Sequence, residues 1–252
     1  MLKFFRRIRQ QLLKENKFSK YLVYAVGEII LVVFGILIAL QINTAKQQKE
    51  DRSFELMMLS NIRNEIASDI NFCEFLQDRL RQIDQAAQDL LQSYGTDDDS
   101  LVLQLYPVMS MGISFEYRKG AYEALKSTGL DKISNDSIRD GLTLMYDFGL
   151  PRVSRWLDEF DRYQENVVQE TVLQLFAPEI ITDEEGNRST IRGLKVKKLL
   201  QDSRFLRLIV IYQYRAREQM RILEVMIPQY QTGLTQLNKE LKDSYPFQAV
   251  EE

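Results

Sequence analysis

The sequence predicts an all-α protein in which a single N-terminal transmembrane helix precedes an elongated extracytoplasmic helical bundle with a small β-hairpin. Three observations lead to this prediction. One apolar run of membrane-spanning length lies near the N-terminus, long stripes of apolar residues recur at three- and four-residue spacing, and the 252 residues include only 5 Pro and 11 Gly. So few chain-breaking residues leave most of the chain able to form helices.

Composition excludes several kinds of chemistry. The chain has no His and a single Cys, which rules out Ser-His-Asp triads, Cys-His pairs and His-containing zinc motifs. Internal disulfides and thiolate metal clusters are ruled out as well, and no Gly-rich phosphate loop is found. The sequence therefore predicts no catalytic residue, no cofactor-binding residue and no metal ligand. Catalysis by a pair of Asp or Glu side chains that folding brings together remains an alternative.

The segment 21–43 is the predicted transmembrane helix. Glu28 is its only charged residue, and a helix of roughly 20 residues rises about 30 Å, the thickness of a hydrocarbon core. A buried helix of a soluble protein and a cleaved signal peptide are the alternatives. The basic, aromatic flank argues against the first. The length of the apolar run, and the absence of a small-x-small cleavage site before Lys46, argue against the second.

The distribution of charge predicts the orientation in the membrane. Residues 1–20 contain seven basic residues and one Glu, whereas residues 44–53 contain three basic and two acidic residues. Because positive charge resists translocation, we expect the N-terminus to stay in the cytoplasm and residues 44–252 to lie outside it. The net charge of the whole chain is −3, so the part beyond residue 20 is acidic, which argues against a nucleic-acid partner.

The cytoplasmic segment 1–20 has an apolar and a basic face. This separation predicts an interfacial helix that rests on anionic lipid headgroups. The predicted lipid-surface contacts are Lys3, Phe4, Phe5, Arg6, Arg7 and Ile8. An unstructured basic segment that serves only membrane orientation is the alternative.

One face of the predicted transmembrane helix combines small and polar residues. The predicted packing residues are Tyr24, Glu28, Val32, Gly35, Ala39 and Asn43. Small residues let helix backbones approach, and an intramembrane carboxyl group seeks a polar partner, so this face predicts packing against a second copy or another membrane protein. Two alternatives remain: Glu28, about 10 Å from Tyr21, reaches the headgroups, or it belongs to a proton or ion path in an oligomer.

Three long amphipathic helices are predicted after the membrane segment. They cover 59–90, 151–176 and 205–241, where apolar residues recur every three or four positions and Pro228 is expected to kink the last helix. The first can be continuous with the transmembrane helix. One-sided helices bury their stripes against each other in a bundle, or against another chain as coiled-coil seams.

Shorter elements are delimited by caps and turns. Residues 97–100 can cap a helix, a short helix near 117–127 is closed by Gly129, and residue 135 or 136 can cap another helix that ends near Gly149. A hairpin is expected between 180–182 and 189–191.

Aromatic residues and the single cysteine fall on the apolar faces. We expect Cys73 to be a small buried hydrophobic residue, with crosslinking of two copies as the alternative. Five aromatic residues are expected in the core rather than in a ligand cage: Trp156, Phe160, Tyr163, Tyr212 and Tyr230.

Residues 3–6 (Lys-Phe-Phe-Arg), 27–29 (Gly-Glu-Ile) and 35–43 (Gly-Ile-Leu-Ile-Ala-Leu-Gln-Ile-Asn) form a dense set of motifs, and 122–127 (Tyr-Glu-Ala-Leu-Lys-Ser) forms a weaker second block. They resemble an uncharacterised family of Bacteroidota inner-membrane proteins, defined only as a domain of unknown function. Relatives usually continue Asn-Trp-Asn, whereas this chain has Thr-Ala-Lys at 44–46. The resemblance implies a Gram-negative inner membrane, a periplasmic body and no known reaction.

These features predict a non-enzymatic, single-span anchoring, assembly or accessory subunit. Its expected partners are membrane lipids and either a second copy or another inner-membrane protein. The alternative is a periplasmic sensor of a small ligand that signals through a partner, because the short cytoplasmic segment cannot hold an output domain. A polar pocket with convergent groups would favour sensing or catalysis, and an exposed apolar groove would favour assembly.

Overall fold

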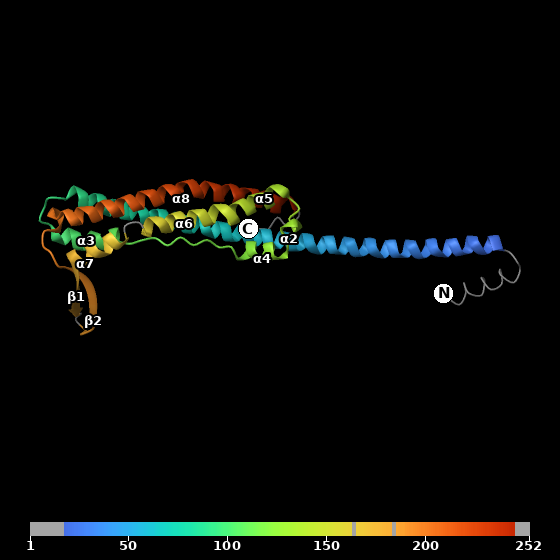
Figure 1. Ribbon diagram of the computed structural model, residues 1–252, viewed down its shortest axis with the longest axis horizontal. Coiled ribbons are helices and arrows are strands. Elements are labelled where there is room, and N and C mark those ends of the chain that lie inside the picture. Colours follow the sequence, from blue (N-terminus) through green and yellow to red (C-terminus); the bar gives the residue numbers. More distant parts are fainter. Residues whose placement is uncertain (1–17, 163–164, 183–184, 245–252) are drawn as a thin grey trace, which may run out of the picture. The chain divides into compact units, whose positions relative to one another are not determined.

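The computed structural model describes residues 18–162, 165–182 and 185–244. It is mostly helical, with one small sheet (Figure 1), so the all-α prediction is confirmed at this level. The chain divides into two units, residues 1–55 and 56–252, and each is described by itself. The predicted boundaries at residues 20 and 43 stay predictions.

The described part of the first unit is helical. Helix α2 (Phe18–Gln92) begins here, as predicted for the segment that follows residue 20. It is long and apolar enough to cross a membrane, and none of its most apolar window is buried by the described protein. Large apolar side chains from Leu22 to Ile42 are exposed instead. A buried core helix of a soluble protein would be covered by its own chain, so the structure does not support that alternative.

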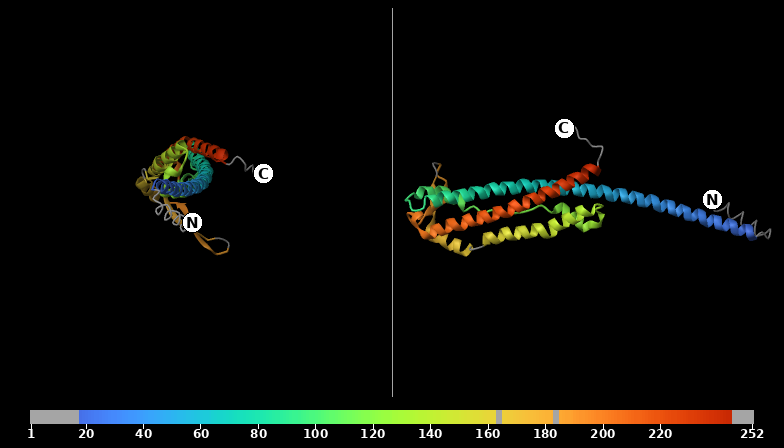
Figure 2. Two further views of the ribbon diagram at one scale, coloured as in Figure 1. Left: turned by 90° about the vertical axis from the view of Figure 1, so that its right-hand side faces the viewer. Right: turned by 90° about the horizontal axis from the view of Figure 1, so that it is seen from above.

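Three helices lie alongside one another in the second unit (Figures 1 and 2). They are the part of α2 after residue 55, α6 (Leu150–Arg162) and α8 (Ser203–Ser244). The predicted stripe on 59–90 is buried, including Cys73. The last predicted helix is confirmed as α8, which contains Pro228 inside its length. Packing of α2 against the rest of the chain therefore supplies the bundle core.

The predicted helix 151–176 corresponds to α6 and α7 (Glu165–Leu175), and residues 163 and 164 between them lie outside the described residues. The helical part ends where predicted, and the chain becomes a strand at Phe176. Phe176 is buried and stacks on Tyr106, with ring centroids 4.3 Å apart. Packing of this ring in the core, rather than the later proline, marks the change from helix to strand.

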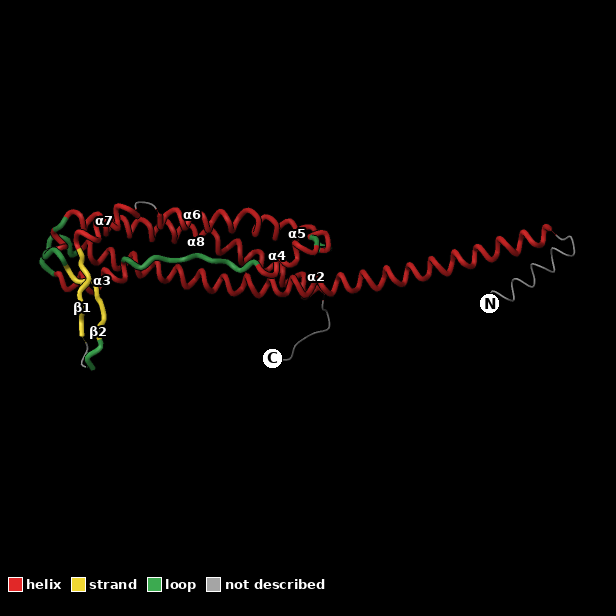
Figure 3. The backbone as a smooth tube through the Cα atoms, turned by 60° about the horizontal axis from the view of Figure 1, so that its bottom comes forward, coloured by secondary structure: helices red, strands yellow, loops and turns green. Residues whose placement is uncertain are grey.

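The predicted hairpin is confirmed and is longer than expected. Strands β1 (Phe176–Thr182) and β2 (Arg188–Leu194) pair antiparallel, with Phe176 opposite Leu194 and Thr182 opposite Arg188. Figure 3 shows the hairpin leaving the helices at the end of unit 2 that holds α3 and α7. Gly186, at φ +86°, supplies the left-handed turn residue that the sequence places there.

Both predicted caps are observed. The Asp98 side chain accepts a hydrogen bond from the Leu101 backbone at 3.1 Å and caps α3 (Asp99–Met109). Asn135 caps α5 (Asp136–Thr143) by accepting hydrogen bonds from two backbone N–H groups. Short polar side chains at these positions satisfy donors that a helix start leaves unpaired.

Helix α4 (Gly120–Thr128) starts later than predicted. Residues 111–119 form an extended segment that runs along the helices (Figure 3), and α4 ends at Gly129, whose φ is +114°. Asp69 on α2 binds Arg118, which holds this segment in place. A contact from another element therefore overrides the local preference for helix.

The predicted helix end near Gly149 is wrong. After α5 the backbone continues as a single π-helical turn, η2 (Leu144–Gly149), and Leu150 keeps helical angles into α6. Pro151 lies in the first turn of α6, where its missing N–H costs little because η2 has a longer hydrogen-bond spacing. Two 3₁₀ turns, η1 (Leu130–Lys132) and η3 (Leu199–Gln201), complete the described elements.

Candidate functional site

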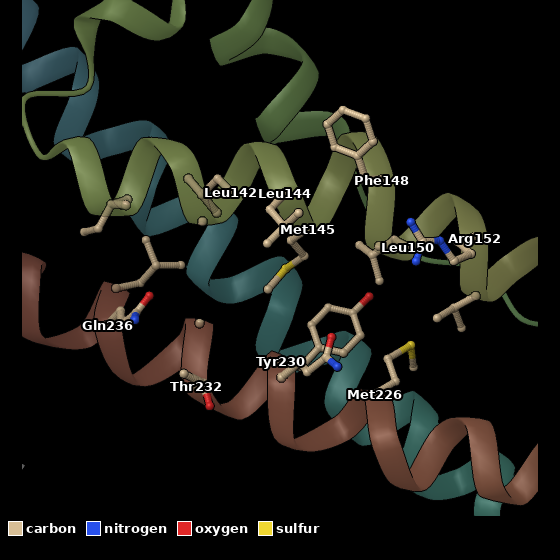
Figure 4. A pocket seen from close by; sticks show the side chains of 17 residues that line it. Leu142, Leu144, Met145, Phe148, Leu150, Arg152, Met226, Tyr230, Thr232 and Gln236 are labelled. Atoms are coloured by element: carbon tan, nitrogen blue, oxygen red, sulfur yellow. The ribbon is translucent and has the colours of Figure 1, made fainter.

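A continuous groove runs along α8 in unit 2. It consists of two adjoining cavities, of about 530 and 850 Å³, between α8 and the segment formed by α5, η2 and α6. Five residues line both cavities: Gly149, Arg152, Val153, Met226 and Gln229. We call this surface the α6–α8 groove, and Figure 4 shows the first of its two cavities.

Helix α8 forms one wall of the groove with exposed residues together with buried ones such as Tyr230 and Leu237. From Tyr214 to Gln236 this wall is about 33 Å long at 1.5 Å per residue. The lining residues occur singly or in adjacent pairs that repeat every three or four positions and so share one side of the helix. They are Tyr214, Glu218, Arg221, Ile222, Val225, Met226, Gln229, Tyr230, Thr232, Gly233, Gln236 and Leu237.

The opposite wall contains the π-helical turn. A π turn adds a residue to the helical ladder and so changes which side chains face a neighbour. Leu144 and Phe148 in η2 are 68% and 57% exposed. Figure 4 shows Met145 directed toward α8 and the Phe148 ring directed away from it. A Cβ atom on Gly233 would lie 2.9 Å from the Met145 terminal methyl carbon, so glycine gives Met145 room at the wall of the groove.

The floor of the first cavity is anchored to α2. Tyr230 is buried, and its hydroxyl donates to Asp69 Oδ2 at 3.4 Å. Asp69 also accepts hydrogen bonds from the Arg118 backbone N–H at 2.9 Å and from Arg118 Nη1 at 2.6 Å. Burial raises the pKa of the Asp69 carboxyl group above its usual value, while Arg118 acts in the opposite direction. This shared carboxylate joins the groove floor to the extended segment.

Glu65 lies one helical turn before Asp69 and also accepts a hydrogen bond from a backbone N–H group near the start of α4. The backbone N–H of Ala121 donates to Glu65 Oε1 at 3.1 Å. A carboxylate at this place satisfies a donor that the start of α4 leaves unpaired. The motif at 122–127 therefore begins in the first turn of a helix that α2 caps.

Tyr146 brings an unsatisfied group into the same region. Its ring stacks on Tyr122 with centroids 4.6 Å apart. Its hydroxyl is buried and has no hydrogen-bond partner among the described residues. Burial raises the pKa of Tyr146, and the nearby charges of Glu65 and Asp69 add to that increase. The π-helical turn η2 thus carries a buried hydroxyl group whose lost hydration is not replaced by a hydrogen bond among the described residues.

Exposed apolar side chains line the second cavity. Trp156 is 46% exposed and Val225 is 62% exposed. The prediction that Trp156 belongs to the core is therefore wrong, because α6 presents it to the groove rather than to α2. Phe160 also lines the groove, Tyr230 is buried as predicted, and Tyr163 lies outside the described residues.

Charged residues flank these apolar side chains. The guanidinium carbon of Arg152 lies 6.0 Å from the centre of the Trp156 ring. No carboxylate pairs with Arg152 within the part of the chain that the structure describes. On the α8 side Arg221 and Glu218 form an ion pair at 3.3 Å. Glu159, seven residues after Arg152, lines the same cavity.

A smaller, polar cavity of about 220 Å³ lies between α2, α6, α7 and α8. Gln219 donates to Asp161 Oδ1 at 3.0 Å, and Arg215 forms an ion pair with Glu165 at 3.7 Å. Burial raises the pKa of Asp161, an effect that the hydrogen bond from Gln219 opposes. These two pairs satisfy part of the polar lining of this cavity.

Other sequence predictions are placed as follows. Among the described residues no group of three or more His, Cys, Asp or Glu side chains is placed to hold a metal ion. Cys73 is buried, and burial raises the pKa of its thiol to about 12. The hydrophobic role predicted for Cys73 is thus confirmed, and a buried thiol cannot crosslink two copies.

The predicted membrane residues are placed only as far as α2 extends. Val32, Gly35, Ala39 and Asn43 lie on α2 with exposed positions, and Tyr24 and Glu28 lie on the same helix. Packing of this face stays a prediction. The predicted lipid contacts Lys3, Phe4, Phe5, Arg6, Arg7 and Ile8 lie outside the described residues.

The sequence analysis missed the residues of the α6–α8 groove. A signal was present, because Val210, Tyr214, Ile222 and Val225 form a second apolar stripe on α8 at three- to four-residue multiples. A helix with two stripes needs two partners, but only one stripe was considered.

Comparison with protein families, curated proteins and solved structures found no match to this chain.

Proposed function

We propose that this chain is a non-enzymatic, single-span membrane protein that holds a partner protein at the bacterial inner membrane. Helix α2 anchors it, the N-terminus lies in the cytoplasm, and residues 44–252 lie in the periplasm. The α6–α8 groove is the docking surface for the partner. The observation that carries the proposal is the groove itself, whose lining includes the exposed apolar side chains of Trp156, Tyr214 and Val225.

An apolar groove of this length is costly to leave in water. Burial of apolar area contributes roughly 25 cal/mol per Å², so covering Trp156 and Val225 would stabilise a complex. Large exposed apolar patches on soluble domains mark protein or membrane contacts. The groove therefore supports assembly over the other functions that the sequence leaves open.

The membrane part of the proposal has separate support. Large apolar residues of α2 from Leu22 to Ile42 are exposed in the described protein, and a bilayer would cover them. The excess of positive charge in residues 1–20 supports a cytoplasmic N-terminus. The resemblance to Bacteroidota inner-membrane proteins agrees with this arrangement.

The polar cavity gives less support to a sensor. A ligand site offers polar groups that the ligand can satisfy, whereas Asp161 already binds Gln219 and Glu165 already pairs with Arg215. We therefore retain assembly as the function.

Extraction of the tagged full-length protein into lipid nanodiscs, followed by native mass measurement, tests the proposal. We expect the wild type to carry a stoichiometric partner and the Val225→Asp variant to lose it. Leu173→Asp is the matched control, because Leu173 is an exposed apolar residue of α7 outside the groove. A wild-type protein that is recovered alone, or loss of the partner in both variants, would contradict the proposal.

The orientation requires its own test. A reporter enzyme that is active only in the periplasm is fused after Glu252, and the membranes are washed with carbonate. We expect an active reporter that stays with the membrane pellet. An inactive reporter, or release by carbonate, would overturn the proposed topology.

A further inference from the structure

We infer that the occupant of the α6–α8 groove is an amphipathic α-helix of a different protein, with an acidic residue opposite Arg152 and a basic residue opposite Glu159. The inference rests on the proposed function, because it assumes that the groove docks a protein. It adds the secondary structure, length and charge pattern of the docked segment.

The shape of the groove indicates a helix. Both walls are helical, and along each the lining residues occur singly or in short groups that repeat every three or four positions. Ridges of side chains with this spacing fit into the ridges and grooves of a third helix. The wall from Tyr214 to Gln236 is about 33 Å long, which matches a helix of about 22 residues.

The lining also suits a polypeptide better than an acyl chain. Gln229 and Gln236 line the first cavity beside the apolar residues, whereas the hydroxyl of Thr232 already donates to the Pro228 carbonyl oxygen at 2.8 Å. Side-chain amides require hydrogen-bond partners when they are covered. A docked helix supplies polar side chains along its flanks, whereas an acyl chain would leave the two amides unsatisfied.

The positive charge of Arg152 indicates which residue of the docked helix would lie opposite it. This residue lines both cavities, its guanidinium group lies over Trp156, and in the described chain it has no carboxylate partner. A docked helix that excludes water here would favour a carboxylate opposite Arg152. Glu159 lies about 10 Å further along α6, so a basic residue one heptad from that carboxylate completes the pattern.

A second copy fits these charges less well. Parallel pairing of α6 in two copies would place Arg152 against Arg152 and Glu159 against Glu159, which is unfavourable. Only antiparallel pairing would match the charges, and the experiment below detects it.

Two fluorescent peptides of about 22 residues test the inference on the full-length protein in nanodiscs. Both have the same stripe of leucines; one carries Glu and, seven residues later, Lys, whereas in the other the Glu is replaced by Lys. We expect wild type to bind the Glu peptide roughly fivefold more tightly, as for one partly exposed ion pair. Arg152→Glu should reverse this preference. Empty nanodiscs correct for peptide that binds lipid.

Arg155→Glu is the matched control variant. Arg155 is an exposed cation on α6 that does not line the groove, so this variant should keep the wild-type preference. Equal binding of the two peptides by wild type, or the same change in both variants, would overturn the inference.

Other occupants give different results. Binding of dodecanoate but of neither peptide would assign the groove to an acyl chain. A dimer in the native mass experiment that Arg152→Glu breaks and the double variant Arg152→Glu, Glu159→Arg restores would assign it to an antiparallel second copy. Either result would overturn the inference. Recovery of a partner protein while both peptides fail to bind would reject the inference and leave the proposed function standing.

Discussion

The two halves of α8 have similar sequence patterns and different surroundings. In the first half Phe205, Leu208 and Ile209 are fully buried in a cluster with α3, η3 and the base of the hairpin. From Tyr214 through the second half, one side of the helix is open along the α6–α8 groove, and Val225 is 62% exposed. Helical spacing alone therefore shows that a face is apolar, but not whether the same chain covers it.

Polar groups do not separate the two halves in the same way. Asp202, at the start of α8, accepts from the Arg204 backbone N–H at 2.8 Å and pairs with its guanidinium group. Buried atoms without a hydrogen bond among the described residues occur in both regions: Gln213 Nε2 in the first half and the Tyr146 hydroxyl beside the second. Coverage of apolar side chains, rather than pairing of polar groups, therefore distinguishes the closed first half from the open second half.

The largest expected effect concerns the closed half. We expect Phe205→Ala to lower the free energy of unfolding by about 3–5 kcal/mol, because it leaves a cavity in a fully packed cluster. Urea unfolding of the full-length protein, followed by circular dichroism, measures it. A loss below about 1 kcal/mol would mean that this half is not closed as described.

The next effect concerns the cap of the closed half. Asp202→Ala should cost about 1 kcal/mol, as for other N-cap residues. Hydrogen bonds from Arg204 lower the pKa of Asp202 below 3.8. Its contribution is therefore present above the unfolded-state pKa and is lost as the pH falls through the folded-state pKa. Unfolding measured from pH 7 to 2 should show a smaller acid loss in the variant, and equal acid slopes would contradict this role.

A smaller effect of opposite sign is expected beside the open half. Tyr146→Phe should raise the free energy of unfolding by about 1 kcal/mol, because it removes a buried hydroxyl that lacks a partner. Tyr106→Phe in the closed half is the matched control and should lower it, since the Tyr106 hydroxyl accepts from Arg192 at 3.1 Å. Destabilisation by both variants would show that the Tyr146 hydroxyl is satisfied.

The smallest effect on stability separates folding from docking. Val225→Ala should change the free energy of unfolding by no more than about 0.5 kcal/mol, as for exposed positions. The same variant should weaken recovery of the partner in nanodiscs. If stability falls by as much as for Phe205→Ala, the open half is part of the core and the comparison fails.

Several elements of the fold follow from local sequence. The buried stripe on 59–90, the caps at Asp98 and Asn135, and the hairpin are all where the residues predict them. In each case the signal depends on neighbours within a few positions. The extended segment before α4 was missed because its conformation depends on Asp69, about fifty residues earlier in the chain.

The candidate site was harder to predict than the fold. Trp156 lies on an apolar stripe, and sequence spacing cannot distinguish a face that meets α2 from one that meets a groove. The π-helical turn changes the register between α5 and α6 without a sequence signal that we recognised. Arg152 and Glu159 become candidate binding residues only because the structure places both of them in the lining of the groove.

By itself, the sequence determined that α2 carries an apolar segment of membrane-spanning length, and that amphipathic helices and one hairpin follow it, because these properties depend on composition and short-range spacing. Only the tertiary structure decided which apolar faces are covered. Coverage depends on contacts between residues far apart in the chain, such as Phe205 with Phe176 and Tyr106. The groove borders α8 from Tyr214 onward, opposite the segment formed by α5, η2 and α6.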